Sequence, residues 1–243
     1  MNFIIPNWPA AKNIKALSTL RNDGVSQSPF DSFNLGAHVG DDVELVEKNR
    51  TLLLNAGGLP SAPVWLNQTH STNIISLPLS PSYSFGDNVD GSFTTEKNQV
   101  CCVMTADCLP VLFCDKAGSK VAAVHAGWRG LCDGILEQTV EALDCSELMV
   151  WIGPAIGFDS FEVGDEVKQQ FMAVDAQAEV AFSIKGSGKW LADMNLLATQ
   201  RLNRAGIVDI YYSNLCTYQN NQDFFSYRKE GQTGRQATLI WLE

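Results

Sequence analysis

The chain has 243 residues, of which 45% are apolar and 18% charged, and its formal net charge is −10. This composition is typical of a globular domain, and no apolar run reaches the roughly 18 residues of a membrane span. The acidic balance disfavours a duplex nucleic-acid binder, because phosphate contacts require a basic surface. The N-terminus lacks a basic segment followed by a long apolar run, so we expect no secretion and a cytoplasmic location. Seven cysteines without a Cys-x-x-Cys pair indicate mostly buried free thiols in a reducing compartment.

Helical and strand patterns alternate along the first half of the chain. A helix is expected over residues 42–55, with Asp42 as N-cap and Gly57 just past the end. Residues 64–66 predict a short strand that leads into Asn67-Gln-Thr-His. Three apolar runs of strand length follow, separated by short turn-like connections, over residues 100–104, 110–114 and 121–124.

The second half continues this alternation. An amphipathic helix over about residues 131–143 precedes a strand at 148–152, which predicts a strand–helix–strand unit. Further helices are predicted at 165–173 and 190–205, the second ended by Gly206, and late strands at 208–212 and 237–241. No linker separates two compositional halves, so residues 1–243 are expected to form one α+β domain of mixed sheets and covering helices.

Three side chains near strand ends form a candidate metal site. His70 follows a predicted strand, Cys108 lies in a tight connection between two strands, and His125 ends a strand. Two imidazoles and one thiolate suit zinc, and three protein ligands leave the fourth position open, as in catalytic sites. Zinc lowers the pKa of a bound water toward about 7. Taken alone, each residue is more often explained by packing or ordinary hydrogen bonding, and the spacing is much less specific than a Cys-x-x-Cys pair.

Other local patterns are weaker. Residues 130–134 read Gly-Leu-Cys-Asp-Gly and match a nucleophile elbow at Cys132, although a pair of glycines at a helix start explains them equally well. Dinucleotide, P-loop and His-Glu-x-x-His motifs are absent from the sequence. Arg21, Arg129 and Arg228 lie in predicted loops, where each could bind phosphate or carboxylate, or form an ordinary salt bridge.

Eight ordered segments resemble the YfiH-like family, also called the laccase-domain or multicopper polyphenol oxidase-like family. They extend from near residue 20 to near residue 235 and cover almost the whole chain. The segments are Arg21-Asn-Asp-Gly-Val-Ser, Asn34-Leu-Gly-Ala-His-Val-Gly-Asp-Asp, Asn67-Gln-Thr-His, Thr105-Ala-Asp-Cys-Leu-Pro, Val124-His-Ala-Gly-Trp-Arg-Gly, Gly153-Pro-Ala-Ile-Gly, Phe161-Glu-Val-Gly and Phe225-Ser-Tyr-Arg. One departure, Asn22-Asp23-Gly24 where the family usually has a glycine pair, leaves the metal site untouched.

The resemblance implies a four-layer α/β/β/α sandwich with a zinc site at His70, Cys108 and His125. It also implies purine nucleoside phosphorylase activity on adenosine, inosine, guanosine and 5′-methylthioadenosine, with adenosine deamination as a related activity. The expected partners are a small nucleoside and phosphate. Asp107 is a candidate for supporting the metal ligands through a hydrogen bond, or for shuttling a proton. Substrate- or phosphate-binding roles are assigned by hypothesis to Arg21, His38, Arg129 and Arg228, and catalytic roles to Asp107, Arg129 and Arg228.

Three alternatives stay open. A copper-dependent polyphenol oxidase would use the same ligands, but its further copper cluster would have only His38 left as an imidazole donor. An editing hydrolase acting on peptidoglycan precursors would fit the same zinc site, and nothing in the sequence separates its substrate from a nucleoside. A non-catalytic metal- or ligand-binding module ranks last, because the open coordination position argues against a purely structural metal.

Overall fold

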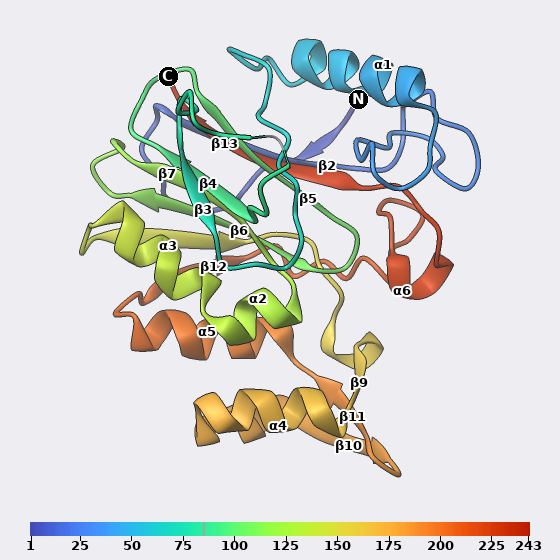
Figure 1. The fold of residues 1–243 in the computed structure, drawn as a ribbon, viewed down its shortest axis with the longest axis vertical. Coiled ribbons are helices and arrows are strands. Elements are labelled where there is room, and N and C mark those ends of the chain that lie inside the picture. The colour runs from blue at the N-terminus through green and yellow to red at the C-terminus, as the bar shows by residue number, and fades with distance from the viewer. Residues whose placement is uncertain (85) are drawn as a thin grey trace.

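The computed structural model describes residues 1–84 and 86–243, in which helices and strands form a mixed α/β fold (Figure 1). The largest sheet contains β3 (Ile74–Leu77), β4 (Gly91–Thr94), β6 (Leu109–Asp115), β7 (Val121–Ala126), β8 (Leu148–Ile152) and β12 (Asp209–Tyr212). Their order in space is β12-β8-β6-β7-β4-β3, with β12 parallel to β8 and β3 parallel to β4. The other pairs in this sheet are antiparallel, so the expected mixed sheet is present.

Two further sheets complete the strands of the described residues. The four-stranded sheet contains β1 (Phe3–Ile4), β2 (Ile14–Thr19), β5 (Val100–Thr105) and β13 (Gln236–Leu242), in the order β1-β2-β13-β5. The small third sheet contains β9 (Glu162–Gly164), β10 (Phe182–Gly186) and β11 (Lys189–Ala192), in the order β10-β11-β9. The pairing of β13 with both β2 and β5 joins the C-terminal strand to the first half of the chain.

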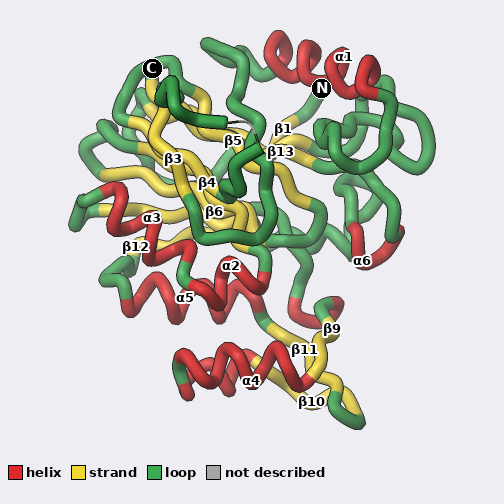
Figure 2. The backbone as a smooth tube through the Cα atoms, viewed as in Figure 1, coloured by secondary structure: helices red, strands yellow, loops and turns green. Residues whose placement is uncertain are grey.

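Helices flank the two large sheets on opposite sides (Figure 2). They are α1 (Val43–Ala56), α2 (Trp128–Asp133), α3 (Ile135–Leu143), α4 (Asp165–Val174), α5 (Met194–Arg204) and α6 (Tyr227–Glu230), with short 3-10 turns at Phe158–Ser160 and Ala176–Ala181. In the figure α1 lies on one side of the strands and α2, α3 and α5 lie on the other, while α4 lies beside the small sheet. Within the described residues, no helix combines the length and apolar character needed to cross a membrane.

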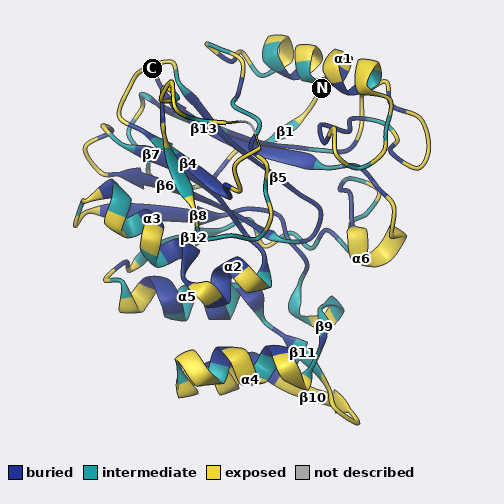
Figure 3. Ribbon diagram, viewed as in Figure 1, coloured by how far each residue is buried: buried dark blue, intermediate teal, exposed yellow. Residues whose placement is uncertain are grey.

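Three apolar clusters show how these elements pack. Leu239 and Trp241 of β13 pack with Leu53 of α1, whereas Ile240, between them, packs with strands of the six-stranded sheet. Successive strand residues face opposite sides, so β13 contributes to a core on each face of its sheet. The outer face of the six-stranded sheet packs against α2, α3 and α5. β5 to β8 are buried along their whole length (Figure 3), which explains their continuous apolar sequences.

Several predicted boundaries are wrong for identifiable reasons. Residues 64–66 have no strand partner, and only the neighbouring Asn67 forms an isolated bridge. The helix expected at 131–143 is two helices, because Gly134 adopts a φ of 102° and ends α2 before α3 begins. The helix expected from residue 190 begins at Met194, because residues 189–192 pair with β9 and β10 as β11.

Candidate metal centre and its cavity

The three expected metal ligands meet at one end of the six-stranded sheet. Pairing of β6 with β7 sets Pro110 opposite His125, which brings Cys108, just before β6, beside that imidazole. The Sγ atom of Cys108 lies 3.7 Å from Nε2 of His70, and the ligand atoms of all three residues lie within 4.8 Å of one another. The centroids of the two imidazole rings are 4.8 Å apart. The group could therefore hold a metal ion, and its two nitrogens and one sulfur are donors that suit zinc.

Asp90, a residue that sequence reasoning missed, holds two of these ligands in place. Its fully buried carboxylate accepts a 2.8 Å hydrogen bond from Nδ1 of His125 and a 2.9 Å bond from the backbone N–H of His70. It also accepts bonds from the backbone and hydroxyl of Ser71. With Nδ1 engaged, Nε2 of His125 is the nitrogen left for a metal. The bond to His70 also steadies a residue whose φ is 66°, an uncommon conformation for a non-glycine residue.

The segment before His70 is fixed from a second direction. The side chain of Gln68 donates to the carbonyl of Met104 and accepts from its N–H, both at 2.8 Å. Met104 belongs to β5, so this pair ties the His70 loop to the four-stranded sheet. The candidate metal ligands are thus held by both large sheets.

Opposing electrostatic effects act on the thiol and imidazole of this group. Burial disfavours the thiolate of Cys108, but the neighbouring His125 and His70 outweigh it and lower the pKa of the thiol to about 6. Burial likewise disfavours the imidazolium of His125, yet the thiolate of Cys108 and the carboxylate of Asp90 raise its pKa to about 9. The thiolate form, which is the form that binds metals, is therefore favoured near neutral pH.

Gly127 leaves the space that the ligands need. A Cβ atom at this position would lie 2.2 Å from Cδ2 of His70 and 3.2 Å from Sγ of Cys108. We expect Gly127→Ala to push His70 aside and weaken zinc binding by on the order of 10–100-fold, as for other changes that misorient ligands. A competition titration against a chelator measures this loss. Gly86→Ala is the control, since its Cβ would meet only Ser84 Oγ at 3.8 Å; equal zinc affinity in both variants would contradict the prediction.

A cavity of about 470 Å³ opens over the metal ligands. Two guanidinium groups line it, those of Arg129 and Arg235. Arg129 is exposed and stacks 4.3 Å from the ring of Trp128, while Arg235 donates to the carbonyls of Thr233 and Gly234. The cavity therefore places positive charge beside the candidate metal site, which suits an anionic group such as phosphate.

His38 also lines this cavity, as its hypothesised substrate contact requires. Its side chain is exposed at the edge of the site. Partial desolvation, helped by the positive charges of Arg235 and Arg50, lowers its pKa. The imidazole is therefore mainly neutral at pH 7 and can accept a hydrogen bond as well as donate one.

Asp107 and Arg228 lie beside the site but outside its cavity. One carboxylate oxygen of Asp107 accepts from the hydroxyl of Thr217, and the other accepts from the backbone N–H of Arg228, both at 2.6 Å. The guanidinium of Arg228 is directed elsewhere and donates to the carbonyl of Glu162 at 2.7 Å. Both carboxylate oxygens of Asp107 are thus occupied by hydrogen bonds to residues outside the cavity. This favours a role in holding the loop that carries Cys108 over a role in proton transfer.

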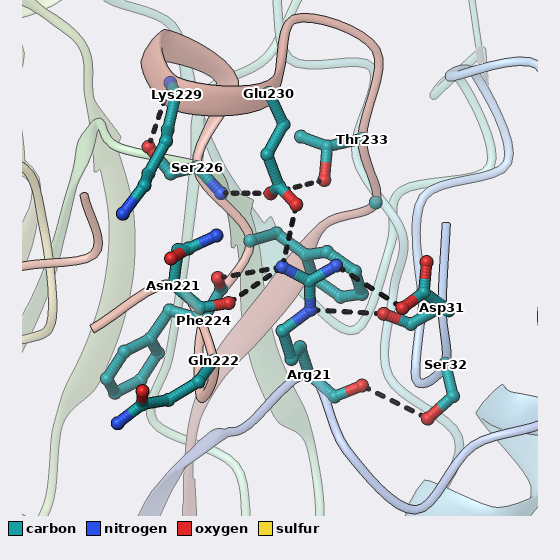
Figure 4. Close-up of polar contacts among 12 residues, drawn as sticks. Arg21, Asp31, Ser32, Asn221, Gln222, Phe224, Ser226, Lys229, Glu230 and Thr233 are labelled. Carbon is teal, nitrogen blue, oxygen red and sulfur yellow. Dashed lines mark hydrogen bonds and ion pairs between the residues drawn. The ribbon is translucent and has the colours of Figure 1, made fainter. Parts of the chain in front are cut away.

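Arg21 does not line the cavity, contrary to the position expected for a phosphate ligand. Figure 4 shows the polar contacts that its side chain makes instead. Its buried guanidinium donates to the backbone carbonyls of Asp31 and Asn221 and to the carboxylate of Glu230. It also stacks on the ring of Phe225. These contacts use its donors to join the N-terminal segment to the loop before α6 and to α6 itself, so its position indicates a structural role.

Cys132 lies in α2 and is buried. Burial and the negative charge of Asp133 raise the pKa of its thiol. A nucleophilic cysteine needs an accessible thiolate. Cys132 does not line the metal-site cavity either. Gly134, the second glycine of the apparent nucleophile elbow, separates α2 from α3, so a structural role explains it.

Comparison with known proteins extends these observations. The family described as multi-copper polyphenol oxidoreductase laccase matches residues 15–243. The chain is 51% identical to a purine nucleoside phosphorylase of Haemophilus influenzae, with 100% of both sequences covered. It is 51% identical to the purine nucleoside phosphorylase YfiH of Escherichia coli over 98% of each sequence. A purine nucleoside phosphorylase of Pseudomonas aeruginosa is 45% identical, over 99% of this chain and 98% of that protein.

Solved structures share the same fold. A Neisseria meningitidis protein of the DUF152 family aligns with a TM-score of 0.93 and 46% identity, over 100% of both chains. YlmD from Geobacillus stearothermophilus aligns with a TM-score of 0.92 and 28% identity, over 100% of this chain and 97% of that one. The expected fold of mixed sheets with covering helices is therefore confirmed.

Proposed function

This chain belongs to the multi-copper polyphenol oxidoreductase laccase family, which includes its YfiH relatives, and we propose that it is a metal-dependent purine nucleoside phosphorylase. The observation that carries the proposal is the cavity in which a His-Cys-His group and two arginines meet, in a chain about half identical to proteins named for this activity. We further propose that residues 1–243 act as one catalytic domain and that the metal is zinc.

His70, Cys108 and His125 would hold the ion. Bound zinc would supply a Lewis acid, which polarises an oxygen of the substrate without needing a proton. Asp90 keeps Nε2 of His125 available, and the Gln68–Met104 pair keeps the His70 loop against β5. These contacts hold the donors in one geometry before any ligand arrives, which reduces the cost of organising the site during the reaction.

Phosphorolysis exchanges one bond to the ribose for another. A phosphate oxygen forms a bond to C1′ while the bond from C1′ to purine N9 breaks, and the electron pair of that bond leaves with the base. In our proposal Arg129 and Arg235 bind the phosphate oxygens, and His38 contacts the substrate. Two guanidinium groups offset the charge of the phosphate and orient it toward C1′.

The direct test is phosphate-dependent release of hypoxanthine from inosine, with zinc measured in the same preparation. The proposal expects hypoxanthine and ribose 1-phosphate in equal amounts, with about one zinc per chain, as three ligands from one chain imply. Bound zinc without any such turnover would overturn the proposal. Turnover of peptidoglycan precursors would then favour the editing-hydrolase alternative.

Arg235→Ala and Arg129→Ala are expected to raise the KM for phosphate by about 10–100-fold each, since each removes a charge-assisted hydrogen-bond donor. The KM for inosine should change much less. Steady-state kinetics with each substrate varied separately measures both constants. Arg228→Ala is the matched control, because its guanidinium donates to Glu162 outside the cavity; an increase as large in that variant would contradict the assignment.

We also propose deamination of adenosine as a second activity. Attack on C6 of the purine needs an activated water, so for this reaction adenosine would bind with its base in the metal-site cavity, in a different pose from that of phosphorolysis. Formation of inosine from adenosine in the absence of phosphate tests this activity. A copper oxidase is not favoured. The sequence contains one histidine besides the two ligands, His38, and a multicopper cluster needs several more imidazoles.

A further inference from the structure

A second cavity of about 440 Å³ adjoins the metal-site cavity. The two share His38 and Met104 as lining residues, so they meet at these side chains. None of the candidate metal ligands lines the second cavity, and neither Arg129 nor Arg235 does. A ligand that extends from the metal site past Met104 would therefore enter a region without the candidate metal ligands, Arg129 or Arg235.

The lining of this second cavity is mainly apolar. Trp65 supplies its aromatic surface, and the remaining apolar side chains are Ala37, Pro63, Val64, Leu66, Leu79 and Met104. Its polar lining residues are His38, Arg50 and Asn67. Binding a flat heterocycle calls for such a lining, with an aromatic ring for stacking and few charged groups. The guanidinium of Arg50 also lines this cavity, but its donors are engaged by the carbonyl of Leu35 and by Glu47, so it offers less to a phosphate than Arg129 and Arg235 do.

Trp65 is held rigidly enough to act as a stacking surface. The guanidinium of Arg50 lies 4.2 Å from the centroid of its ring. Arg50 is itself fixed, because its Nε and Nη2 atoms donate to the carbonyl of Leu35 and its Nη1 atom pairs with Glu47. An aromatic ring that is already ordered loses little conformational freedom when a ligand stacks on it.

We propose that this second cavity is the nucleobase subsite, in which the purine ring packs against Trp65 and Met104 while phosphate lies at Arg129 and Arg235. The assignment rests on the proposed phosphorylase function. It divides the substrate along the cleft: the purine in the apolar part, the ribose near His38 and Met104, and phosphate in the cationic part. The bond between base and sugar then lies where the two cavities meet, near His38 and Met104.

Two variants at one position test the subsite. Trp65→Leu keeps an apolar side chain but removes the flat aromatic ring, and Trp65→Phe restores an aromatic ring. We expect Trp65→Leu to raise the Kd for hypoxanthine and the KM for inosine by about tenfold, within the range found when a base loses an aromatic stacking partner. The KM for phosphate should stay within about twofold, and Trp65→Phe should recover most of the loss.

Trp8→Ala is the control. It removes another half-buried indole, from a cavity near β2 and the C-terminus that shares no lining residue with the metal site. Calorimetric titration with hypoxanthine needs no turnover, so it separates the two proposals. If wild type phosphorolyses inosine but Trp65→Leu binds hypoxanthine as tightly as wild type, the subsite is wrong and the function stands. If wild type does not act on inosine but hypoxanthine binds and Trp65→Leu weakens it, the function is wrong and the purine subsite stands.

Discussion

Cys108→Ala is expected to remove both zinc and phosphate-dependent turnover of inosine. Cys108 supplies the thiolate of the candidate metal group, and its loss leaves two imidazoles. Affinity for zinc should fall by more than the roughly 10–100-fold that follows loss of an outer partner, because a direct ligand is removed. Metal analysis after dialysis and a hypoxanthine-release assay on the same sample measure the two effects together.

Cys132→Ala is the matched control for this experiment. It also removes a buried thiol, but that thiol lies in α2 and outside the cavity. Zinc content and turnover should therefore equal those of wild type. If Cys108→Ala lost turnover while keeping its zinc, the thiol would act in chemistry rather than as a ligand. If Cys132→Ala lost turnover with zinc intact, the nucleophile-elbow alternative would gain support.

The ionisation of the Cys108 thiol can be measured separately from metal binding and turnover. In metal-free protein its thiol should titrate near pH 6, because His125 and His70 outweigh the effect of burial. An ordinary cysteine titrates at about 8.5, so most of the thiolate absorbance of wild type at pH 7 should disappear in Cys108→Ala. Buried Cys101 and Cys102 do not contribute, since burial raises the pKa of both thiols far above neutral pH. Equal ultraviolet absorbance of both proteins at pH 7 would contradict this assignment.

The grouping of His70, Cys108 and His125 could be predicted because side chains of this kind are few in the sequence. Cys108 lies directly before β6 and His125 lies near the end of β7, and such strand ends can be read from apolar runs. His70 lies in a loop, because the strand expected before it does not form. The partners of these ligands are different. Asp90 precedes β4, a four-residue strand with the sequence Gly-Ser-Phe-Thr, which carries almost no strand signal. Its place beside His125 follows from the pairing of β4 with β7, which the sequence does not specify.

The positions of the arginines also depend on tertiary pairing that the sequence does not specify. Arg235 lies just before β13, and only the pairing of Gln236 with Thr105 brings it to the loop that carries Cys108. The sequence predicts strand β13, but it does not predict that β13 pairs with β5. Arg21, in contrast, is a loop arginine in the sequence, yet its Nη1 atom donates to the carbonyls of Asn221 and Phe224, which are 200 and 203 residues away. A guanidinium is available to a ligand only where the tertiary structure leaves its donors free, and no local pattern reports this.

Asp90→Asn is expected to damage both the metal site and the fold. The carboxylate offers acceptors to His125, to the backbone of Thr69, His70 and Ser71, and to the hydroxyl of Ser71. An asparagine keeps one of the two oxygens, so its amide N–H groups would face donors instead of acceptors. Leaving a buried donor without a partner costs about 1–3 kcal/mol of unfolding free energy. Zinc affinity should also fall by roughly 10–100-fold, because His125 loses the partner that orients it.

Chemical denaturation and chelator competition on Asp90→Asn measure the two losses, and Asp87→Asn is the matched control because its side chain is exposed.

The lowered pKa of Asp90 also predicts how the stability difference between wild type and Asp90→Asn changes with pH. Burial alone would raise the pKa of Asp90, but hydrogen bonds from His125 and Ser71 outweigh it and lower the pKa. A carboxylate with a lowered folded-state pKa stabilises the fold above its unfolded value of about 3.9 and loses that contribution as the pH falls through the folded value. The stability difference between wild type and Asp90→Asn should therefore be full at neutral pH and shrink in acid; a difference that grows in acid would contradict the role assigned to Asp90.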